Sequence, residues 1–387
     1  MNYKPKLVRI TTVPISLKTL LKGQHQFMSE HFEVIGISSE GSELRDVENT
    51  EGIRVIPIGM TRTISPLRDL RSLWDLYKVL KKEKPLIVHS HTPKAGIVGM
   101  LAAKLAGVPY RLHTVAGLPL MEAKGGKRKL LNIVEKMTYS FATKIYPNSK
   151  GLFDFITVNN FAKRQKMSVI GNGSSNGINT NYFNPELFSE TDKELWRKDI
   201  GINPTDFVFI FVGRLVGDKG INELIASFNK ISKEYIQIKL LLVGSLEPDL
   251  DPLLPETLEV IKLNPNIIAV GFQNDVRKYF AISDALVFPS YREGFPNVVM
   301  QAGAMGLPSI VSNINGCNEI IEEGENGLII PVKDSNAIYL SMRKMLSDTD
   351  FREKMKQKSR SMITTRYEQQ VVWKLILKEY KNFVENV

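Results

Sequence analysis

Short runs of apolar, mostly β-branched residues alternate with longer amphipathic stretches along most of this chain. This alternation is typical of parallel sheets whose strands are connected by crossover helices. Between two of the apolar runs, apolar residues at helical spacing predict a helix over Pro66–Lys82, with a proline near its start. The strands predicted in the first half are Leu7–Thr11, Glu33–Ile37, Arg54–Ile58, Leu86–Ser90, Tyr110–Thr114, Lys144–Pro147 and Met167–Ile170.

A segment without periodicity follows these strands. Residues Gly171–Phe183 are rich in glycine, serine and asparagine, which favour turns, and we interpret them as a linker between two domains. An amphipathic pattern over Glu368–Val384 predicts a C-terminal helix. The elements predicted between linker and tail are the strands Phe207–Val212, Lys239–Val243, Ile267–Val270, Ala285–Phe288 and Pro308–Ser312, and the helices Ile221–Ile231, Asp275–Ile282 and 297–305.

The length of 387 residues fits two domains better than one compact core. We therefore predict an α/β protein with two doubly wound domains, residues 1–180 and 181–366. If the two domains face each other, they leave a cleft at the carboxyl ends of their strands, where such sheets bind ligands. No membrane-spanning helix and no signal peptide are expected. The single Cys317 excludes an intramolecular disulfide, fits a reducing cytoplasm and is interpreted as structural.

The net charge of +10 is unevenly distributed. Residues 1–187 contain 27 Lys and Arg against 14 Asp and Glu, a net of +13, whereas the remainder contains 24 against 27, a net of −3. This asymmetry indicates a negatively charged partner (anionic lipid, a lipid diphosphate or nucleic acid), with solubility as the plainer alternative. Nucleic acid is the least favoured and is not expected, because the cations are scattered and no recognition motif accompanies them.

The segment Phe288–Gly306 carries the most informative chemistry. An apolar strand ends in a loop that presents Glu293 and Gly294, and a helix that starts at Pro296–Asn297 carries Gln301 on its second turn. A helix N-terminus offers unpaired N–H groups to phosphate oxygens, and glycine permits close backbone approach. The carboxylate can accept hydrogen bonds from sugar hydroxyls, and the amide can bond a ribose. These features predict a site for a nucleotide-sugar diphosphate; an ordinary strand–turn–helix with an acidic loop is the alternative.

A glycine-rich turn with two cations follows the predicted strand Phe207–Val212. Its sequence is Gly-Arg-Leu-Val-Gly-Asp-Lys-Gly, residues 213–220, directly before a helix. Arg214 and Lys219 can neutralise a diphosphate leaving group. The order Gly-x4-Gly-Lys-Ser/Thr of a Walker A loop is missing. A strand–helix turn with surface cations is the alternative.

Together these two segments resemble the signature regions of the retaining two-domain glycosyltransferases of group 1, family 4 type. Glu293 matches the first residue of their Glu-x7-Glu signature, and Gln301 replaces the second. This replacement exchanges a charged hydrogen bond, worth about 1.5–3 kcal/mol, for a neutral one worth about 0.5–1.5 kcal/mol. The resemblance covers nearly the whole chain. It implies the GT-B fold of two Rossmann-like domains, with an N-terminal acceptor-binding domain, a C-terminal domain that binds the nucleotide sugar, and a last helix, 367–387, packed back on the N-terminal domain.

The resemblance also implies roles for individual residues. The family often has a Gly-Gly loop after its first strand, whereas this chain has 11–17 there and a glycine only further on, which puts the acceptor contacts in doubt. A lone histidine such as His113 is more often a packing residue. The expected catalytic residues are His113, Arg214, Lys219 and Glu293. The expected substrate-binding residues are Gly213, Gly244, Phe272, Gly294, Phe295, Pro296, Asn297 and Gln301. The expected acceptor contacts are Gly23, His91, Lys94, Lys127 and Arg128.

No obligatory metal or cofactor is expected. The sequence Asp249-Leu250-Asp251 matches the Asp-x-Asp metal motif of the other major glycosyltransferase fold, but it lies in a proline-flanked loop of the second domain, so we interpret it as a surface loop. No Cys pair and no His-Glu-x-x-His spacing supports zinc.

The function expected from the resemblance is transfer of a hexosyl or N-acetylhexosaminyl group from a nucleotide sugar, UDP-linked, to a lipid-diphosphate-linked glycan in surface polysaccharide or capsule biosynthesis. Apolar residues 118–121, expected to be exposed, lie beside the cations of 124–129, which suits a peripheral protein on the inner face of the cytoplasmic membrane. A solvated helix start explains that segment equally well. The alternative functions are a nucleotide-sugar epimerase or phosphorylase of the same fold, and a non-catalytic membrane scaffold.

Overall fold

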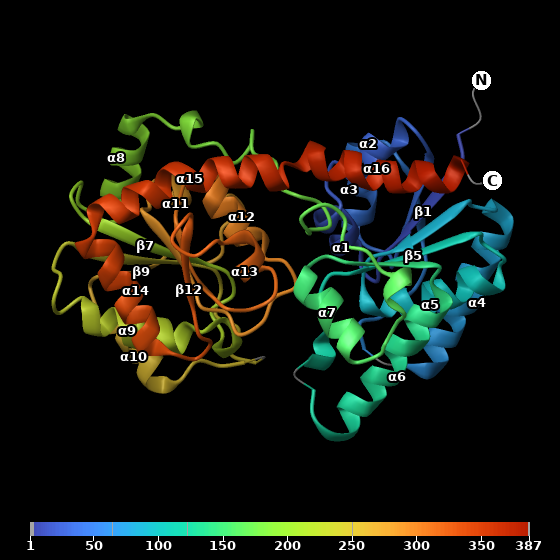
Figure 1. Ribbon diagram of the computed structural model, residues 1–387, viewed down its shortest axis with the longest axis horizontal. Coiled ribbons are helices and arrows are strands. Elements are labelled where there is room, and N and C mark those ends of the chain that lie inside the picture. The colour runs from blue at the N-terminus through green and yellow to red at the C-terminus, as the bar shows by residue number, and fades with distance from the viewer. Residues whose placement is uncertain (1–3, 64, 122, 250, 386–387) are drawn as a thin grey trace. The chain divides into compact units, whose positions relative to one another are not determined.

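The computed structural model describes residues 4–385 apart from 64, 122 and 250. Contacts divide the chain into two compact units (Figure 1). The first unit comprises Met1–Gly177 together with Gln369–Val387, and the second comprises Ile178–Glu368. The roles that the resemblance assigns to the two domains stay predictions.

The first unit contains a six-stranded parallel sheet in the order β3-β2-β1-β4-β5-β6. Its central strands are apolar and buried, as is typical of a parallel sheet covered on both faces. The strands are β1 (Lys6–Ile10), β2 (Glu33–Ser38), β3 (Arg54–Pro57), β4 (Ile87–Ser90), β5 (Tyr110–Val115) and β6 (Lys144–Pro147).

Helices cover both faces of this sheet (Figure 1). The C-terminal helix belongs to this unit, because Val372, Ile376 and Tyr380 share a core with Leu7 and Val34. One face is covered by α4 (Pro66–Glu83), α5 (Pro93–Leu105), α6 (Gly125–Phe141) and α7 (Lys150–Val158). The other is covered by α1 (Pro14–Leu20), α2 (Gln24–Ser29), α3 (Ser42–Glu51) and α16 (Gln369–Glu385).

The second unit contains another six-stranded parallel sheet, in the order β12-β11-β10-β7-β8-β9. Its strands are β7 (Phe207–Val212), β8 (Ile238–Val243), β9 (Ile267–Ala269), β10 (Ala285–Phe288), β11 (Ser309–Ser312) and β12 (Gly327–Ile330). Its helices are α8 (Glu190–Asp199), α9 (Ile221–Ile231), α10 (Pro255–Leu263), α11 (Arg277–Ala281), α12 (Asn297–Ala304), α13 (Cys317–Ile320), α14 (Ser335–Ser347) and α15 (Thr349–Tyr367).

Both sheets have the strand order of the doubly wound fold, in which the direction of winding reverses between two neighbouring strands. This switch point lies between β1 and β4 in the first unit and between β7 and β10 in the second. The predicted α/β class with two doubly wound sheets is confirmed. Among the residues that the structure describes, no helix combines the length and the apolar character needed to span a bilayer.

Two sequence predictions are wrong in detail. Met167–Ile170 is not a strand: Met167 forms one bridge with Ile145, and the chain then turns away at Gly171, whose φ is positive. Leu118 and Leu120 are buried in the first core, not exposed, because the single 3-10 turn at 119–121 directs them inward. The exposure expected for the apolar segment 118–121 is therefore wrong for Leu118 and Leu120, whereas Met121 is 39% exposed.

Candidate functional site

Two loops of the second unit follow the strands that flank its switch point. The loop Gly213–Gly220 follows β7, and the loop Pro289–Pro296 follows β10. They therefore lie at the carboxyl edge of the sheet, where doubly wound sheets bind ligands. A third loop begins at Gly244 after β8 and is joined to the first, since the carbonyl of Ser245 accepts a hydrogen bond from the Leu215 N–H at 2.8 Å.

Two glycines allow these loops to approach one another. A Cβ on Gly220 would lie 2.2 Å from the carbonyl oxygen of Pro289, and a Cβ on Gly244 would lie 1.8 Å from that of Gly213. Gly220 and Gly244 have φ values of 72° and 149°, which L side chains rarely adopt. Gly220 and Gly244, of which Gly244 was predicted to bind substrate, thus permit the packing of loop against loop.

Lys219 and Glu293, one from each flanking loop, form an ion pair. Their side chains are only 15% and 19% exposed, so water screens the pair incompletely. Ser290 also donates a hydrogen bond to Glu293 Oε1 at 3.0 Å. The sequence pattern indicates both charged residues but not Ser290, although Ser290 lies in the same segment as Glu293. The two contacts fix an amine and a carboxylate at the switch point.

Arg214 makes a separate contact. Its guanidinium donates to the Glu247 carboxylate at 3.0 Å, and both side chains are partly exposed. Nothing in the sequence pattern signalled Glu247, because it comes from the loop after β8. Arg214 therefore lies in the same group of loops as Lys219, but with a different carboxylate.

Asp251 anchors the cationic turn. Its carboxylate accepts from the Asp218 N–H at 2.6 Å, and its carbonyl accepts from the Gly217 N–H at 3.3 Å. The interpretation of Asp249–Asp251 as a plain surface loop is incomplete, because Asp251 holds Gly217 and Asp218 in place directly before Lys219; Leu250 lies outside the described residues. Asp218 in turn accepts from Arg292 at 3.0 Å, which ties the turn to the loop after β10.

Helix α12 begins at Asn297, directly after the second loop. Its N-cap residue, Pro296, provides no side-chain cap. The Val299 N–H donates to the Pro296 carbonyl at 3.2 Å, which leaves the N–H groups of the first two helical residues to bind an anion. Phe295 is buried against Tyr367, with ring centroids 5.4 Å apart, and fixes the entry of the chain into the helix. Gln301 lies half-buried one turn further along.

Two further predicted substrate-binding residues have different positions. Gly294 lies in the second loop, immediately before Phe295, whereas Phe272 follows β9 and has an exposed ring. Cys317 is fully buried, and burial raises the pKa of its thiol well above the usual value, which agrees with a structural role. Two cations, a fixed carboxylate and an uncapped helix N-terminus at one sheet edge form a set suited to a sugar diphosphate.

The predicted residues of the first unit are mostly buried. His113, near the end of β5, is held by Ser90 Oγ, 2.8 Å from its Nδ1, and its ring would collide with a Cβ on Gly96. Burial lowers the pKa of His113 to about 4, so its ring is neutral at pH 7. His91 is also buried, and its ring nitrogens have no hydrogen-bond partner among the described residues. Their catalytic and acceptor roles stay predictions.

The other acceptor candidates have different environments. Gly23 precedes α2 with a φ of 76° and packs so closely on Trp373 that a Cβ would lie 2.6 Å from that ring. Arg128 donates to the carbonyl of Leu120 and so stabilises the start of α6. Lys94 and Lys127 line an apolar groove, which is described below. Gly23 and Arg128 thus have clear structural roles in the first unit.

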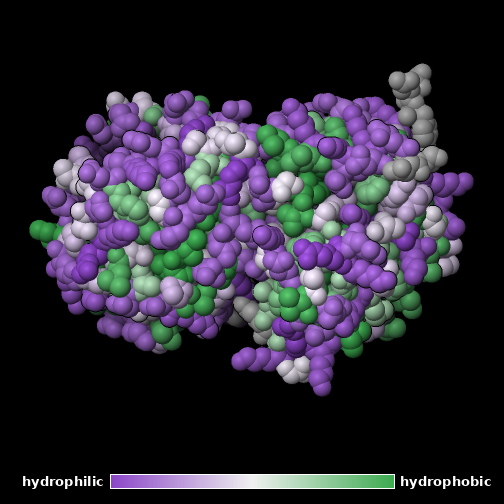
Figure 2. Space-filling model, viewed as in Figure 1, coloured by the Kyte–Doolittle hydropathy of each residue, from purple (hydrophilic) through white to green (hydrophobic). Residues whose placement is uncertain are grey.

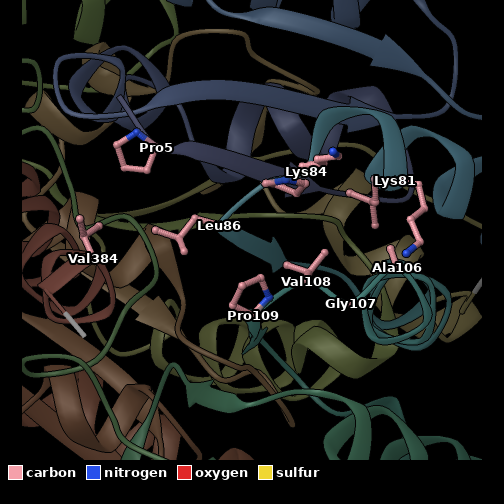
Figure 3. Close-up of a pocket in the computed structure, with 11 residues that line it drawn as sticks. Pro5, Lys81, Lys84, Leu86, Ala106, Gly107, Val108, Pro109 and Val384 are labelled. Carbon is pink, nitrogen blue, oxygen red and sulfur yellow. The ribbon is translucent and has the colours of Figure 1, made fainter. Parts of the chain in front are cut away.

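The first unit also has a hollow at the amino-terminal edge of its sheet, opposite the edge at which the strands end. Its volume is about 600 Å³, and Pro5, Leu86 and Pro109, which precede β1, β4 and β5, line it (Figure 3). Because doubly wound sheets bind ligands at the carboxyl ends of their strands, this amino-end hollow is not a candidate site. Within the described part of the chain, no three His, Cys, Asp or Glu side chains lie together in an arrangement that could hold a metal ion.

Comparison with known proteins gives this geometry a context. Residues 192–362 match the family model described as glycosyl transferases group 1, and residues 26–173 match the glycosyl transferase 4-like domain. The capsular polysaccharide biosynthesis glycosyltransferase CapM of Staphylococcus aureus is 35% identical over 381 residues, which cover 98% of each chain. The UDP-Gal:alpha-D-GlcNAc-diphosphoundecaprenol alpha-1,3-galactosyltransferase of Escherichia coli is 31% identical over 359 residues, which cover 88% of this chain and 89% of that one.

Among solved structures, Anabaena HepE in complex with UDP is similar over 98% of this chain and 100% of its own, with a TM-score of 0.81 and 17% sequence identity. This likeness concerns the fold and confirms the predicted GT-B type. The whole-length similarity to the two curated enzymes, with the two family models, identifies the chemistry. The chain belongs to the group 1 glycosyltransferases and is a glycosyltransferase.

Proposed function

We propose that the chain transfers a sugar from a UDP-sugar, with retention of the anomeric configuration, to a lipid-diphosphate-linked glycan in surface polysaccharide synthesis. The observation that carries this proposal is the Lys219–Glu293 pair, which stands at the switch point beside the uncapped start of α12. Two relatives support it: one acts in capsular polysaccharide biosynthesis, and the other is a UDP-galactose-dependent enzyme whose acceptor is a diphosphoundecaprenol-linked sugar.

Each group at this site has a distinct task in the proposed reaction. The diphosphate binds the first N–H groups of α12, and the positive charges of Lys219 and Arg214 stabilise it as it leaves. Glu293, held by Lys219 and Ser290, accepts hydrogen bonds from the sugar hydroxyls. Gln301 binds the ribose.

The proposed bond changes follow from the retained configuration. The bond between the anomeric carbon and the diphosphate oxygen breaks, and a bond from the same carbon to the acceptor oxygen forms on the same face. The acceptor hydroxyl gives its proton to the departing diphosphate oxygen, so that UDP is the second product. The positive charge that develops on the sugar is balanced by the diphosphate itself.

The proposal is tested by a transfer assay with purified full-length protein. A polyprenyl-diphosphate-linked monosaccharide is offered with a panel of UDP-, GDP- and ADP-sugars, and the anomeric configuration of the product is read by NMR. The proposal requires an α-linked product from an α-linked UDP-sugar. An inverted linkage contradicts the retaining mechanism. Release of free sugar at the same rate without acceptor favours an epimerase or hydrolase instead.

A further inference from the structure

The first unit contains an apolar groove with a volume of about 940 Å³. Helices α4, α5 and α6 form its walls, and most of its lining is aliphatic. The side chains that matter to the argument are Leu70, Leu73, Ile97, Leu101, Leu130 and Val134. An aliphatic groove of this size falls within the range of small-molecule sites, roughly 300–1,000 Å³.

One end of the groove lies at the switch point of the first sheet. Thr12, which follows β1, and Thr92, which follows β4, both line it. These two residues join the loops, because the Thr12 N–H donates to Thr92 Oγ1 at 3.0 Å and the two hydroxyls lie 2.7 Å apart. The apolar groove therefore begins at the edge of the sheet where doubly wound folds bind their ligands.

Cations lie around this apolar surface. Lys94, Arg62 and Lys127 line the groove, together with the carboxyl groups of Asp69 and Glu135. Lys94 pairs with Asp69 at 2.5 Å, whereas Arg62 and Lys127 are exposed and form no ion pair with any described residue. The sequence of the first unit holds 30 Lys and Arg against 15 Asp and Glu, a net of +15, and that of the second holds 21 against 26, a net of −5. A ligand of this groove is thus expected to join an apolar body to a negative group.

The outer surfaces of the same helices are also apolar. Leu67 and Trp74 on α4 are 86% and 56% exposed, and Ile133 and Met137 on α6 are 56% and 43% exposed. Figure 2 shows hydrophobic residues at the surface over α4 to α6 among hydrophilic ones. A groove that opens between such helices can receive a chain that emerges from a bilayer.

We propose that this groove binds the isoprenoid chain of the lipid-diphosphate acceptor, with its diphosphate at Arg62 and Lys127. The inference rests on the proposed function and assigns its acceptor subsite. The groove has room for the isoprene units next to the diphosphate, and the rest of a long lipid stays in the membrane. The charge of Lys94 is already balanced by Asp69, so Arg62 and Lys127 supply the free positive charge.

The test is calorimetric titration of the full-length protein with farnesyl diphosphate, a soluble isoprenoid diphosphate, and with inorganic pyrophosphate. The groove variants are Leu70→Asp and Leu130→Asp. Because the leucine side chains are 63% and 45% exposed, we expect the protein to fold with either substitution. The matched controls are Leu67→Asp and Ile133→Asp, on the same helices but outside the groove. Thermal unfolding of each variant accompanies the titrations.

We expect farnesyl diphosphate to bind at least tenfold more tightly than pyrophosphate. The groove variants should weaken its binding at least tenfold, and the controls less than twofold. Equal losses of farnesyl diphosphate binding in the groove and control variants would indicate nonspecific contact with the apolar surface and would overturn the inference. Pyrophosphate that binds as tightly as farnesyl diphosphate would also overturn it. UDP titrated in parallel separates the two claims. If the protein binds UDP but not farnesyl diphosphate, only the assignment of the groove is wrong. If farnesyl diphosphate binds in the groove but no sugar is transferred, only the proposed function is wrong.

Discussion

At the scale of single residues, the Lys219–Glu293 pair carries most of the account. Its charges come from two different loops, and the sequence pattern indicates both residues because each loop follows an apolar strand and precedes a helix. We predict that Glu293→Gln and Lys219→Met each lower kcat/KM by about 10²–10³, the usual cost of one group that stabilises transition-state charge. Glu325→Gln, which removes another ion pair of the same unit, with Lys358, should stay within twofold. A similar loss in all three variants would contradict the assignment.

The glycines between the loops give a second prediction. Gly244→Ala places a Cβ 1.8 Å from a carbonyl oxygen, whereas Gly271→Ala, at a φ of 68°, meets no atom within 4 Å. Both substitutions incur backbone strain, of order 1 kcal/mol, but only the first also displaces a neighbouring loop. Thermal unfolding should therefore show a larger loss for Gly244→Ala, with loss of nucleotide binding. Equal losses of thermal stability in the two variants would mean that the close approach of Gly244 to Gly213 is not needed.

Gln301 tests the ribose contact. Restoring the family's glutamate with Gln301→Glu replaces a neutral hydrogen bond by a charged one, a gain of about 1 kcal/mol. UDP should then bind roughly fivefold more tightly. The control is a UDP analogue without ribose hydroxyls, which should gain nothing. A gain for both nucleotides would place Gln301 away from the ribose.

At the scale of elements, helix α6 makes stability depend on pH. Glu135 on this helix is buried, and burial raises the pKa of its carboxyl to about 7 from 4.5. The folded state then holds a proton that the unfolded state releases, so the contribution of Glu135 is fully present below pH 4.5 and is lost as pH rises through 7. The loss amounts to about 3 kcal/mol. Glu135→Gln should abolish this slope in urea unfolding, whereas Asp154→Asn, at an exposed position, should keep it. An unchanged slope in Glu135→Gln would contradict the shift.

Most of the strands could be predicted from the sequence, but one predicted strand does not form. Strands such as Phe207–Val212 are apolar throughout and end at a glycine, so hydrophobicity and turn chemistry agree on them. Met167–Ile170 is apolar apart from Ser168, but pairing is a long-range property, and a single bridge is all that the chain forms there. The burial of Leu118 and Leu120 was not predicted for the same reason, because the core they join is assembled from strands and helices far apart in the sequence.

At the scale of the whole molecule, charge and ligand chemistry divide between the two units. The residues proposed to bind the diphosphate of the sugar donor lie in the second unit, whose net charge is −5. The apolar groove with its cations lies in the first unit, whose net charge is +15. The sequence indicated this division, since charge counts need no fold. It could not indicate the groove, because residues from α4, α5 and α6 come together only when these helices pack. Contacts such as Arg214–Glu247 were hidden for the same reason.

The central claim is that the switch-point loops of the second unit bind a uridine diphosphate sugar. Its most direct test is calorimetric titration of UDP, GDP and ADP into the full-length protein and into Lys219→Ala. We predict that UDP binds most tightly of the three and that the substitution weakens its binding at least tenfold. Absence of UDP binding, or equal affinity in the variant, would contradict the account.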